Sequence, residues 1–341
     1  KFRKEVAFEY ESIKENYLSR KSDKQYVSIE SARKNTIITD WENTTIHPVN
    51  QLGLQVFEDI DIETIRNYID WTPFFFTWEM RKKYPAILED KIFGEQAKKL
   101  LDDANKMLDD VIENNWLQAK AVIGLWQANA EGDDVHLTEN GEKIVTYNFL
   151  RQQGKKTRSN KCLADFVAQK SSGKQDYMGS FVCTAGLDIE RQLAIFEKEN
   201  DDYNCILLKA IADRLAEALT EYMHEKIRKE IWGYASDEKF ANEDLIAEKY
   251  RGIRPAPGYT ACPDHTEKEK IFSLLNAEQI GAKLTENMAM SPNATVSGYY
   301  FANPDAKYFS VGKVQDDQIA DYAKRKNITT KEVEKWLQSN I

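Results

Sequence analysis

The sequence contains little cysteine and proline, and these shortages exclude several classes of protein. Four cysteines in 341 residues are too few and too widely spaced for a disulfide framework. We therefore expect reduced thiols and an intracellular protein. Eight prolines and fifteen glycines occur without an internal repeat or a low-complexity tract. The cysteines are Cys162, Cys183, Cys205 and Cys262.

Several familiar sequence signals are also missing. No stretch approaches the roughly 20 apolar residues of a membrane-spanning helix, and the charged N-terminus is unlike a signal peptide. We therefore expect a cytoplasmic protein with no membrane partner. No Gly-x-Gly-x-x-Gly motif follows a predicted strand and no phosphate loop is present. The net charge of -9 argues against a nucleic-acid partner, because phosphate binding requires a clustered positive surface.

The composition that remains is that of an ordered globular protein. Hydrophobic residues make up 42% of the chain, with seven Trp, sixteen Tyr and fifteen Phe. Because the first residue is Lys1 rather than Met, we expect a fragment of a longer polypeptide. Helical spacing of apolar residues predicts a lead-in helix or linker over residues 1–25. Residues 26–341 are predicted to form a single large domain.

Periodicity predicts helices and strands that are interspersed along the chain. Hairpin-type connections outnumber strand-helix-strand crossovers, and residues 119–128 and 143–150 are expected to form a hairpin with a short intervening piece. We therefore predict an α+β fold, with a central twisted antiparallel sheet flanked by helices. Helices are expected at 61–69, 87–116, 203–232, 242–250, 267–275 and twice near the C-terminus, and the other strands at 180–186, 295–301 and 308–314.

The segment from Arg254 to His265 is the strongest candidate for a ligand site. It reads Arg-Pro-Ala-Pro-Gly-Tyr-Thr-Ala-Cys-Pro-Asp-His and holds three of the eight prolines, so it is a stiff loop. Gly258 permits close approach to the main chain. A metal at Cys262 and His265 is an alternative, but no second pair of ligands has matching spacing. A buried Cys and a hydrogen-bonded His explain these two residues better, and their separation does not establish a nucleophile pair.

Carboxylates recur near this loop. Asp213, Glu217 and Glu221 are four residues apart and share one face of a predicted helix. A solvated acidic face is the ordinary explanation, and a cationic ligand is the alternative. Glu248 adds a carboxylate on the helix that leads into the loop. Asp70 lies between a helix end and an aromatic cluster, where capping of local amides is the commoner use.

A basic stretch, Arg81-Lys82-Lys83, has two interpretations. A solvated turn is the simpler of the two. In an acidic protein the same charges are also suited to steering an acidic partner toward the surface.

Several motifs together resemble the C-terminal activation domain of cobalamin-dependent methionine synthase, over a region from about residue 26 to the end. The most specific is Arg254-Pro-Ala-Pro-Gly-Tyr-x-Ala-Cys-Pro-Asp-His-Thr-Glu-Lys. The others are Tyr68-Ile-Asp-Trp-Thr-Pro-Phe-Phe, Asp201-Asp-Tyr-Asn, Ala212-Asp-Arg-Leu-Ala-Glu-Ala, Val296-Ser-Gly-Tyr-Tyr-Phe and Asp305-x-Lys-Tyr.

The resemblance implies a methyltransferase module that binds S-adenosylmethionine and presents its methyl group to reduced cobalamin. It implies reductive methylation of cob(II)alamin, with cobalamin held by another domain of the same chain. A flavodoxin-type or diflavin reductase would supply the electron. The isolated domain is expected only to bind the methyl donor, with no catalytic residue and no metal of its own.

The resemblance also implies roles for single residues. Arg254 would pair with the methionyl carboxylate, because a guanidinium fork suits a bidentate contact, and Asp70 would meet the ammonium group. The backbone of Ala256, Gly258 and Tyr259 would bind the adenosyl part. Glu217, Glu248 and Tyr308 would complete the polar surround.

Two departures from the family pattern affect this assignment. Thr260 stands where a proline is expected, so the loop has one rigid residue fewer than the family pattern implies. The connection from Asn276 to Lys283 is one residue short, so Tyr308 is placed by its Asp-x-Lys-Tyr context. Asp213 is a candidate for holding the histidine ligand released by cobalamin.

Two other functions stay open from the sequence. One is a non-catalytic docking domain for a flavoprotein electron donor and the cobalamin domain. The other is an acidic interaction domain without a ligand. Titration with S-adenosylmethionine separates the last from the first two.

Overall fold

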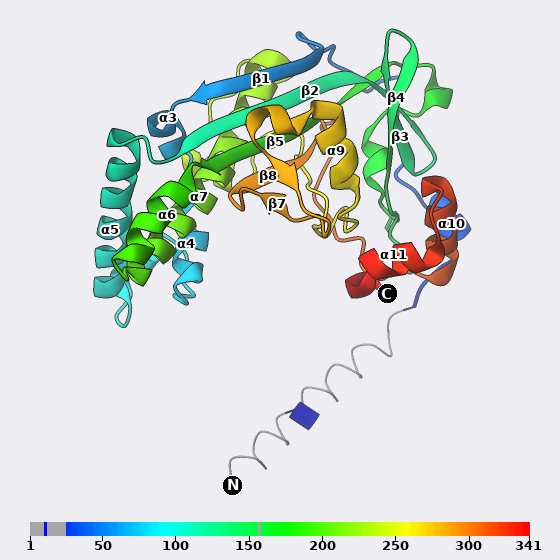
Figure 1. Ribbon diagram of the computed structural model, residues 1–341. Coiled ribbons are helices and arrows are strands. Elements are labelled where there is room, and N and C mark those ends of the chain that lie inside the picture. The colour runs from blue at the N-terminus through cyan, green and yellow to red at the C-terminus, as the bar shows by residue number, and fades with distance from the viewer. Residues whose placement is uncertain (1–9, 12–24, 156–157) are drawn as a thin grey trace.

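A computed structural model describes residues 10–11, 25–155 and 158–341 (Figure 1). The predicted lead-in segment, residues 1–25, therefore lies outside the described residues apart from Tyr10, Glu11 and Gln25. Within the described ranges, no helix has the length and apolar character needed to cross a membrane.

The centre of the protein is a six-stranded sheet in which neighbouring strands are antiparallel. Its main path is β4 (Glu142–Asn148), β3 (Asp134–Glu139), β2 (Gln118–Glu131), β5 (Asp176–Leu187) and β8 (Thr295–Tyr300), and β1 (Gly53–Ile60) also pairs with β2. A separate small sheet consists of β6 (Lys283–Leu284) and β7 (Met290–Ser291).

Strand β2 organises this sheet because it is long enough to pair with three strands. One edge of β2 pairs with β1 over its first half and with β3 at its end, while β5 runs along the other edge. Gly132 makes the tight turn into β3 with φ +65°, a conformation that glycine adopts at little cost.

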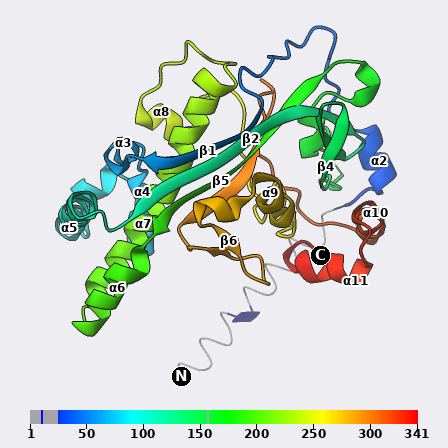
Figure 2. The ribbon, with the colours of Figure 1, turned by 45° about the horizontal axis from the view of Figure 1, so that its top comes forward.

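Helices cover both faces of the sheet (Figure 2). α7 (Asp202–Lys226) packs on one face of β5 and α9 (Glu267–Leu275) on the other. Side chains of a strand alternate between faces, so Phe181 belongs to the α7 core and Val182 to the α9 core. Burial on both faces explains why the β5 sequence is apolar without alternation.

The other α-helices of the described residues are short, except for α5. They are α2 (Ile29–Lys34), α3 (Ile62–Arg66), α4 (Trp71–Thr77), α5 (Gly94–Glu113), α6 (Ile189–Lys198), α8 (Asn242–Ile246), α10 (Asp316–Lys326) and α11 (Thr330–Trp336).

The predicted α+β architecture with an antiparallel sheet is confirmed, and several elements fall close to their expected positions. α9 has the predicted bounds, and the α11 cap is Thr329, whose side chain accepts from the Glu332 amide. Asp70 is the N-cap of α4 and accepts from the Thr72 amide at 2.8 Å. The four cysteines are free and buried.

Several local predictions were wrong, and one strand was missed. Residues 119–128 and 143–150 do not pair, because β3 is a full strand between β2 and β4. Residues 308–314 form no strand, and β1 was not predicted. The helix expected at 87–116 begins only at Gly94, after a 3-10 turn over Ala86–Glu89.

A buried ionic group, the Arg151 cluster, ties the β3 end of the sheet to the short 3-10 helix Leu163–Phe166. Its members are Thr36, Asp133, Arg151, Asn160 and Asp165. The Arg151 side chain is 3% exposed and donates to both carboxylates at 2.7 Å. It also donates to the Thr36 hydroxyl and the Asn160 carbonyl. Each guanidinium nitrogen of Arg151 therefore has a partner, as buried charges require.

Candidate functional site

A charged pocket of about 400 Å³ lies between α4, α7, α8 and the segment that follows α8. Its lining contains four carboxylates and two guanidinium groups. These are Asp70, Glu217, Glu221, Glu248, Arg214 and Arg254. Negative side chains therefore outnumber positive ones, and such a lining favours a ligand that carries net positive charge.

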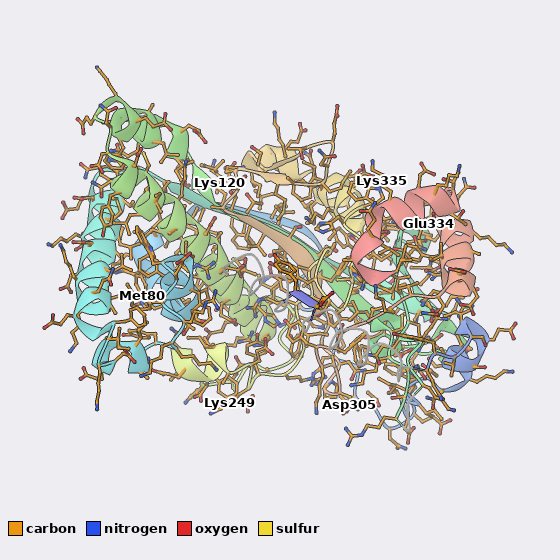
Figure 3. The ribbon with its side chains drawn as sticks, turned by 90° about the horizontal axis from the view of Figure 1, so that it is seen from below. Met80, Lys120, Lys249, Asp305, Glu334 and Lys335 are labelled. Carbon is orange, nitrogen blue, oxygen red and sulfur yellow. The ribbon has the colours of Figure 1, made fainter. Side chains whose placement is uncertain are left out.

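Each of these side chains is placed by a specific local feature. Asp70 is held as the α4 cap, while Glu217 and Glu221 lie one helical turn apart on α7. The helix expected over 242–250 ends at Ile246, so Glu248 lies after α8, with φ +54°, a left-handed conformation that turns the chain toward Arg254. Figure 3 labels Lys249, the residue that follows Glu248.

Arg254 is the centre of a second buried group, the Arg254 cluster, which consists of Glu221, His224, Arg228, Tyr250 and Arg254. The Arg254 side chain is 18% exposed and donates to a Glu221 carboxylate oxygen at 2.8 Å. It also donates to the Tyr250 hydroxyl at 2.5 Å, and its Nη1 lies 3.4 Å from Nδ1 of His224. Arg228 lies over the Tyr250 ring, 4.1 Å from its centroid.

Burial determines the protonation states in the Arg254 cluster. Desolvation, with a further effect from Arg228 and Arg254, holds the pKa of His224 well below its usual value, so the ring is neutral near pH 7. Desolvation raises the pKa of Glu221, and the same two guanidinium groups act against that rise. The ionised Glu221 therefore depends on its arginine neighbours.

Some polar atoms in this cluster, and the neighbouring Tyr300 hydroxyl, lack partners. Glu221 Oε1, His224 Nε2, Arg228 Nη1 and the Tyr300 hydroxyl are buried and have no hydrogen-bond partner among the described residues. Buried polar groups are normally paired, so this concentration of unpaired ones calls for an explanation.

A second pocket, of about 430 Å³, adjoins the first and shares Arg214 and Glu217 with it. One wall of this pocket is the strip Ala256–Tyr259, and the lining also includes Thr295, Val296 and Ser297 of β8. The two pockets therefore lie next to each other along α7, and we refer to them together as the groove. Each has a volume within the range of small-molecule sites, which is about 300 to 1,000 Å³.

The strip is fixed to the edge of the sheet. Ile253 and Phe301 exchange two backbone hydrogen bonds at 3.0 Å, and the Tyr299 amide donates to the Pro255 carbonyl at 2.9 Å. The loop thus extends the sheet beyond β8, which explains how a segment without its own helix or strand keeps a defined shape.

Gly258 is required at its position for two reasons. Its φ is +98°, and an added Cβ would lie 2.3 Å from the His265 ring. The Gly258 amide donates to the Cys262 carbonyl at 2.8 Å, and the Tyr259 amide donates to the Ala256 carbonyl at 3.2 Å. The Ala256 amide and the Gly258 carbonyl have no partner among the described residues, so one donor and one acceptor remain for a ligand.

The predicted site residues are brought together in these two pockets. Asp70, Glu217, Glu248 and Arg254 line the first, and Ala256, Gly258 and Tyr259 line the second. Tyr308 lines neither pocket, although its hydroxyl accepts from the Arg254 amide at 3.0 Å.

Sequence reasoning did not connect Glu221 with Arg254. The prediction of a solvated acidic face was wrong for Glu221, which is 7% exposed and ion-paired. Glu217 is half-buried and Asp213 is exposed. The only available signal for Glu221 was its four-residue spacing from Glu217, because the pairing with Arg254 spans separate elements.

Cys262 and His265 have structural partners. The Cys262 thiol donates to the Ala256 carbonyl at 3.0 Å, and burial raises the pKa of this thiol. His265 Nδ1 lies 3.1 Å from the Lys268 ammonium. Within the described ranges, no group of three or more His, Cys, Asp or Glu side chains is arranged to hold a metal ion.

Comparisons with known proteins agree on one family. Residues 61–327 match the family described as "Vitamin B12 dependent methionine synthase, activation domain". The chain is also similar to a crystal structure of the MetH reactivation domain bound to AdoHcy, with 51% sequence identity and a TM-score of 0.90. That similarity covers 93% of this chain and 98% of the other.

Proposed function

The chain belongs to the family of activation domains of vitamin B12-dependent methionine synthase, and we propose from this that its groove binds S-adenosylmethionine for the reductive methylation of cobalamin. The similar crystal structure contains AdoHcy, the demethylated form of this ligand. The observation that carries the proposal is the groove along α7, which combines a charged pocket with an adjoining backbone strip.

The charged pocket suits the methionyl end of the ligand. Arg254 presents a guanidinium group to the α-carboxylate, and Asp70 offers a carboxylate to the α-ammonium. Glu217 and Glu248 add negative charge for the sulfonium. No ion-pair partner for either glutamate exists among the described residues, so both charges are available.

The second pocket suits the adenosyl end. An adenine presents one donor and one acceptor on its amidine edge. The Gly258 carbonyl and the Ala256 amide offer the complementary pair, two residues apart on the strip. Pro255 and Pro257 keep the strip rigid, and Tyr308 supports it through the Arg254 amide.

The domain contributes by binding and orienting the methyl donor. Bound S-adenosylmethionine supplies a methyl group on a cationic sulfur, and cobalamin on another domain of the same chain supplies the nucleophile. We therefore assign no nucleophile and no general base to this domain. Because the sulfonium charge is lost on transfer, carboxylates that hold it too tightly would slow the reaction. Positioning is the catalytic contribution of the groove.

Calorimetric titration with S-adenosylmethionine tests the proposal. We expect saturable binding by the wild-type chain and a loss of about 30-fold to 100-fold in affinity for Arg254→Ala, because a charged hydrogen-bonded pair is removed. The absence of binding by the wild type would contradict the function. Unchanged affinity of the variant would contradict the assignment of Arg254.

We further propose that residues 26–341 form the binding unit and that the isolated chain binds the methyl donor without transferring its methyl group. The purified chain, free cobalamin and a reductant should then give no methylcobalamin above the rate without protein. Formation at a protein-dependent rate would show that the isolated domain is catalytic.

A docking role for the Arg81-Lys82-Lys83 turn remains a second proposal, with a flavodoxin-type or diflavin reductase as the partner. Lys82 pairs with Asp90 at 2.8 Å, whereas Arg81 and Lys83 have no ion-pair partner in the described part of the chain. Replacing Arg81 and Lys83 with Glu should slow electron delivery from the reductase to cobalamin about tenfold or more at low salt. Lys335→Glu is the control, since Figure 3 shows Lys335 on the opposite side of the molecule from Met80. An unchanged rate would contradict docking at this turn.

A further inference from the structure

Glu221 lies between two guanidinium groups and uses only one of its carboxylate oxygens. Oε2 accepts from Arg254 Nη2 at 2.8 Å, while Oε1 is 3.7 Å from Arg228 Nη1. Both Oε1 and that Nη1 are buried and have no hydrogen-bond partner among the described residues. A small movement of Glu221 toward Arg228 would therefore satisfy two unpaired atoms at once.

Glu221 is also the anionic partner of the proposed carboxylate anchor. The other groups that contact the Arg254 guanidinium are the Tyr250 hydroxyl and the His224 ring, and neither carries negative charge near pH 7. A ligand carboxylate that takes Arg254 must therefore share the guanidinium with Glu221 or displace it. Sharing places two carboxylates around one partly buried cation, which is costly in a region of low dielectric.

We propose that Glu221 is an internal placeholder for the ligand carboxylate: it orients Arg254 before binding and moves to Arg228 when S-adenosylmethionine arrives. This inference rests on the function proposed above. Glu221 is then a positioning residue that sets how strongly the groove selects ligands with an α-carboxylate.

The new contact with Arg228 compensates Glu221 only in part for the contact that it loses with Arg254. Arg228 already donates to both carboxylate oxygens of Glu238, at 2.6 to 3.0 Å, and its side chain is 0% exposed. Its positive charge is thus shared before Glu221 arrives, so Glu221 loses more at Arg254 than it regains at Arg228. Glu221 consequently lowers the affinity for ligands with a carboxylate relative to ligands without one.

The test compares two ligands on Glu221→Gln, a substitution that keeps the shape of the side chain. The probes are S-adenosylmethionine and its decarboxylated analogue, and the quantity is the ratio of their affinities. We expect the ratio in favour of S-adenosylmethionine to rise about fivefold to tenfold in the variant, because the internal competitor is weakened. An unchanged or lower ratio overturns the placeholder role.

Glu248→Gln is the matched control, because it removes one negative charge from the same pocket, whereas the ion pair of Arg254 is with Glu221. The analogue carries more positive charge than S-adenosylmethionine, so loss of any carboxylate raises the ratio slightly. The rise for Glu221→Gln must exceed the rise for Glu248→Gln; equal changes would mean that only pocket charge matters, and would overturn the proposal.

A crystal structure with bound S-adenosylmethionine is an independent test of the placeholder role. We expect Glu221 to leave Arg254 and to come within hydrogen-bond distance of Arg228 Nη1. Retention of the 2.8 Å contact with Arg254 beside a bound carboxylate overturns the inference. In that case the proposed function still stands, whereas failure of the wild type to bind S-adenosylmethionine removes the function itself.

Discussion

The Arg151 cluster and the Arg254 cluster both bury arginine and carboxylate groups, yet they differ in how completely their hydrogen bonds are made. Each guanidinium nitrogen of Arg151 has a partner, and its two carboxylates are held at 2.7 Å. In the Arg254 cluster, Glu221, His224 and Arg228 each leave one buried polar atom unpaired. A fully paired network fixes one arrangement, whereas a partly paired one leaves alternatives of similar energy. The first cluster is therefore suited to holding the fold, and the second to responding to a ligand.

The largest effect is expected from breaking the paired network. Arg151→Met should lower the free energy of unfolding by about 3 to 5 kcal/mol, because it removes the cation from the buried Asp165 and leaves Asp133 with Arg33 as its remaining cation. Urea denaturation followed by circular dichroism measures the change. If the variant remains folded, its affinity for S-adenosylmethionine should stay close to that of the wild type; a stability loss below about 1 kcal/mol would contradict the structural role.

The Arg254 cluster should respond to pH through His224. The folded-state pKa of His224 lies well below the unfolded value near 6.5, so both states are neutral above pH 6.5. As the pH falls below 6.5 only the unfolded chain gains the proton, and stability falls by up to about 1.4 kcal/mol per pH unit from this group. Between pH 6.5 and 5 this group can therefore lower the stability by up to about 2 kcal/mol.

The comparison of wild type with His224→Phe isolates this contribution, because the other titrating groups are common to both proteins. Phe retains a ring against Tyr250 and Tyr300. Denaturation at several pH values should give a smaller slope for the variant. Parallel slopes would show that His224 is protonated equally in both states.

Next in expected size is the effect of Gly258→Ala at the strip. The positive φ and the His265 ring both oppose a Cβ, so we expect a loss of about 1 to 2 kcal/mol in stability. Binding of S-adenosylmethionine should weaken as well. The double variant Gly258→Ala with His265→Ala should recover the part due to the ring contact; no recovery would mean that the backbone conformation alone makes glycine necessary.

The smallest effect should come from an exposed pair, which gives the baseline for both clusters. Lys82→Met removes the contact with Asp90, where the Lys82 side chain is 47% exposed. We expect a change within about 1 kcal/mol in the free energy of unfolding. A larger loss in urea denaturation would show that exposure is a poor guide to the strength of charge pairs in this protein.

The sequence pattern predicted the elements whose signals are local. α9 has the expected bounds because its apolar spacing and flanking residues agree, and Asp70 caps α4 as its position suggested. β1 was missed because Leu54 and Val56 face solvent, so its alternation does not reflect simple burial. The place of β3 between β2 and β4 depends on pairing across the sheet, which spacing alone does not determine.

In the candidate site, too, sequence spacing did not reveal contacts between segments that are far apart in the chain. The resemblance named residues that the structure gathers into one groove, namely Asp70, Glu217, Glu248 and Arg254 with the strip. Glu221 lies 33 positions before Arg254, and their ion pair arises only when α7 packs beside the loop. A carboxylate in a regular acidic series carries no local sign that it is buried. The burial of Glu221 and its pairing with Arg254 could therefore be recognised only from the tertiary structure.

The pairing of the loop with β8 has a consequence for solubility. An open strand edge offers a row of amides and carbonyls to any other extended chain, and natural proteins block such edges with proline. Ile253 and Pro255 occupy the outer side of β8, and neither Pro255 nor Pro257 has an amide hydrogen to pair with a further strand. The segment that forms the wall of the proposed ligand groove therefore also closes this border of the sheet against aggregation.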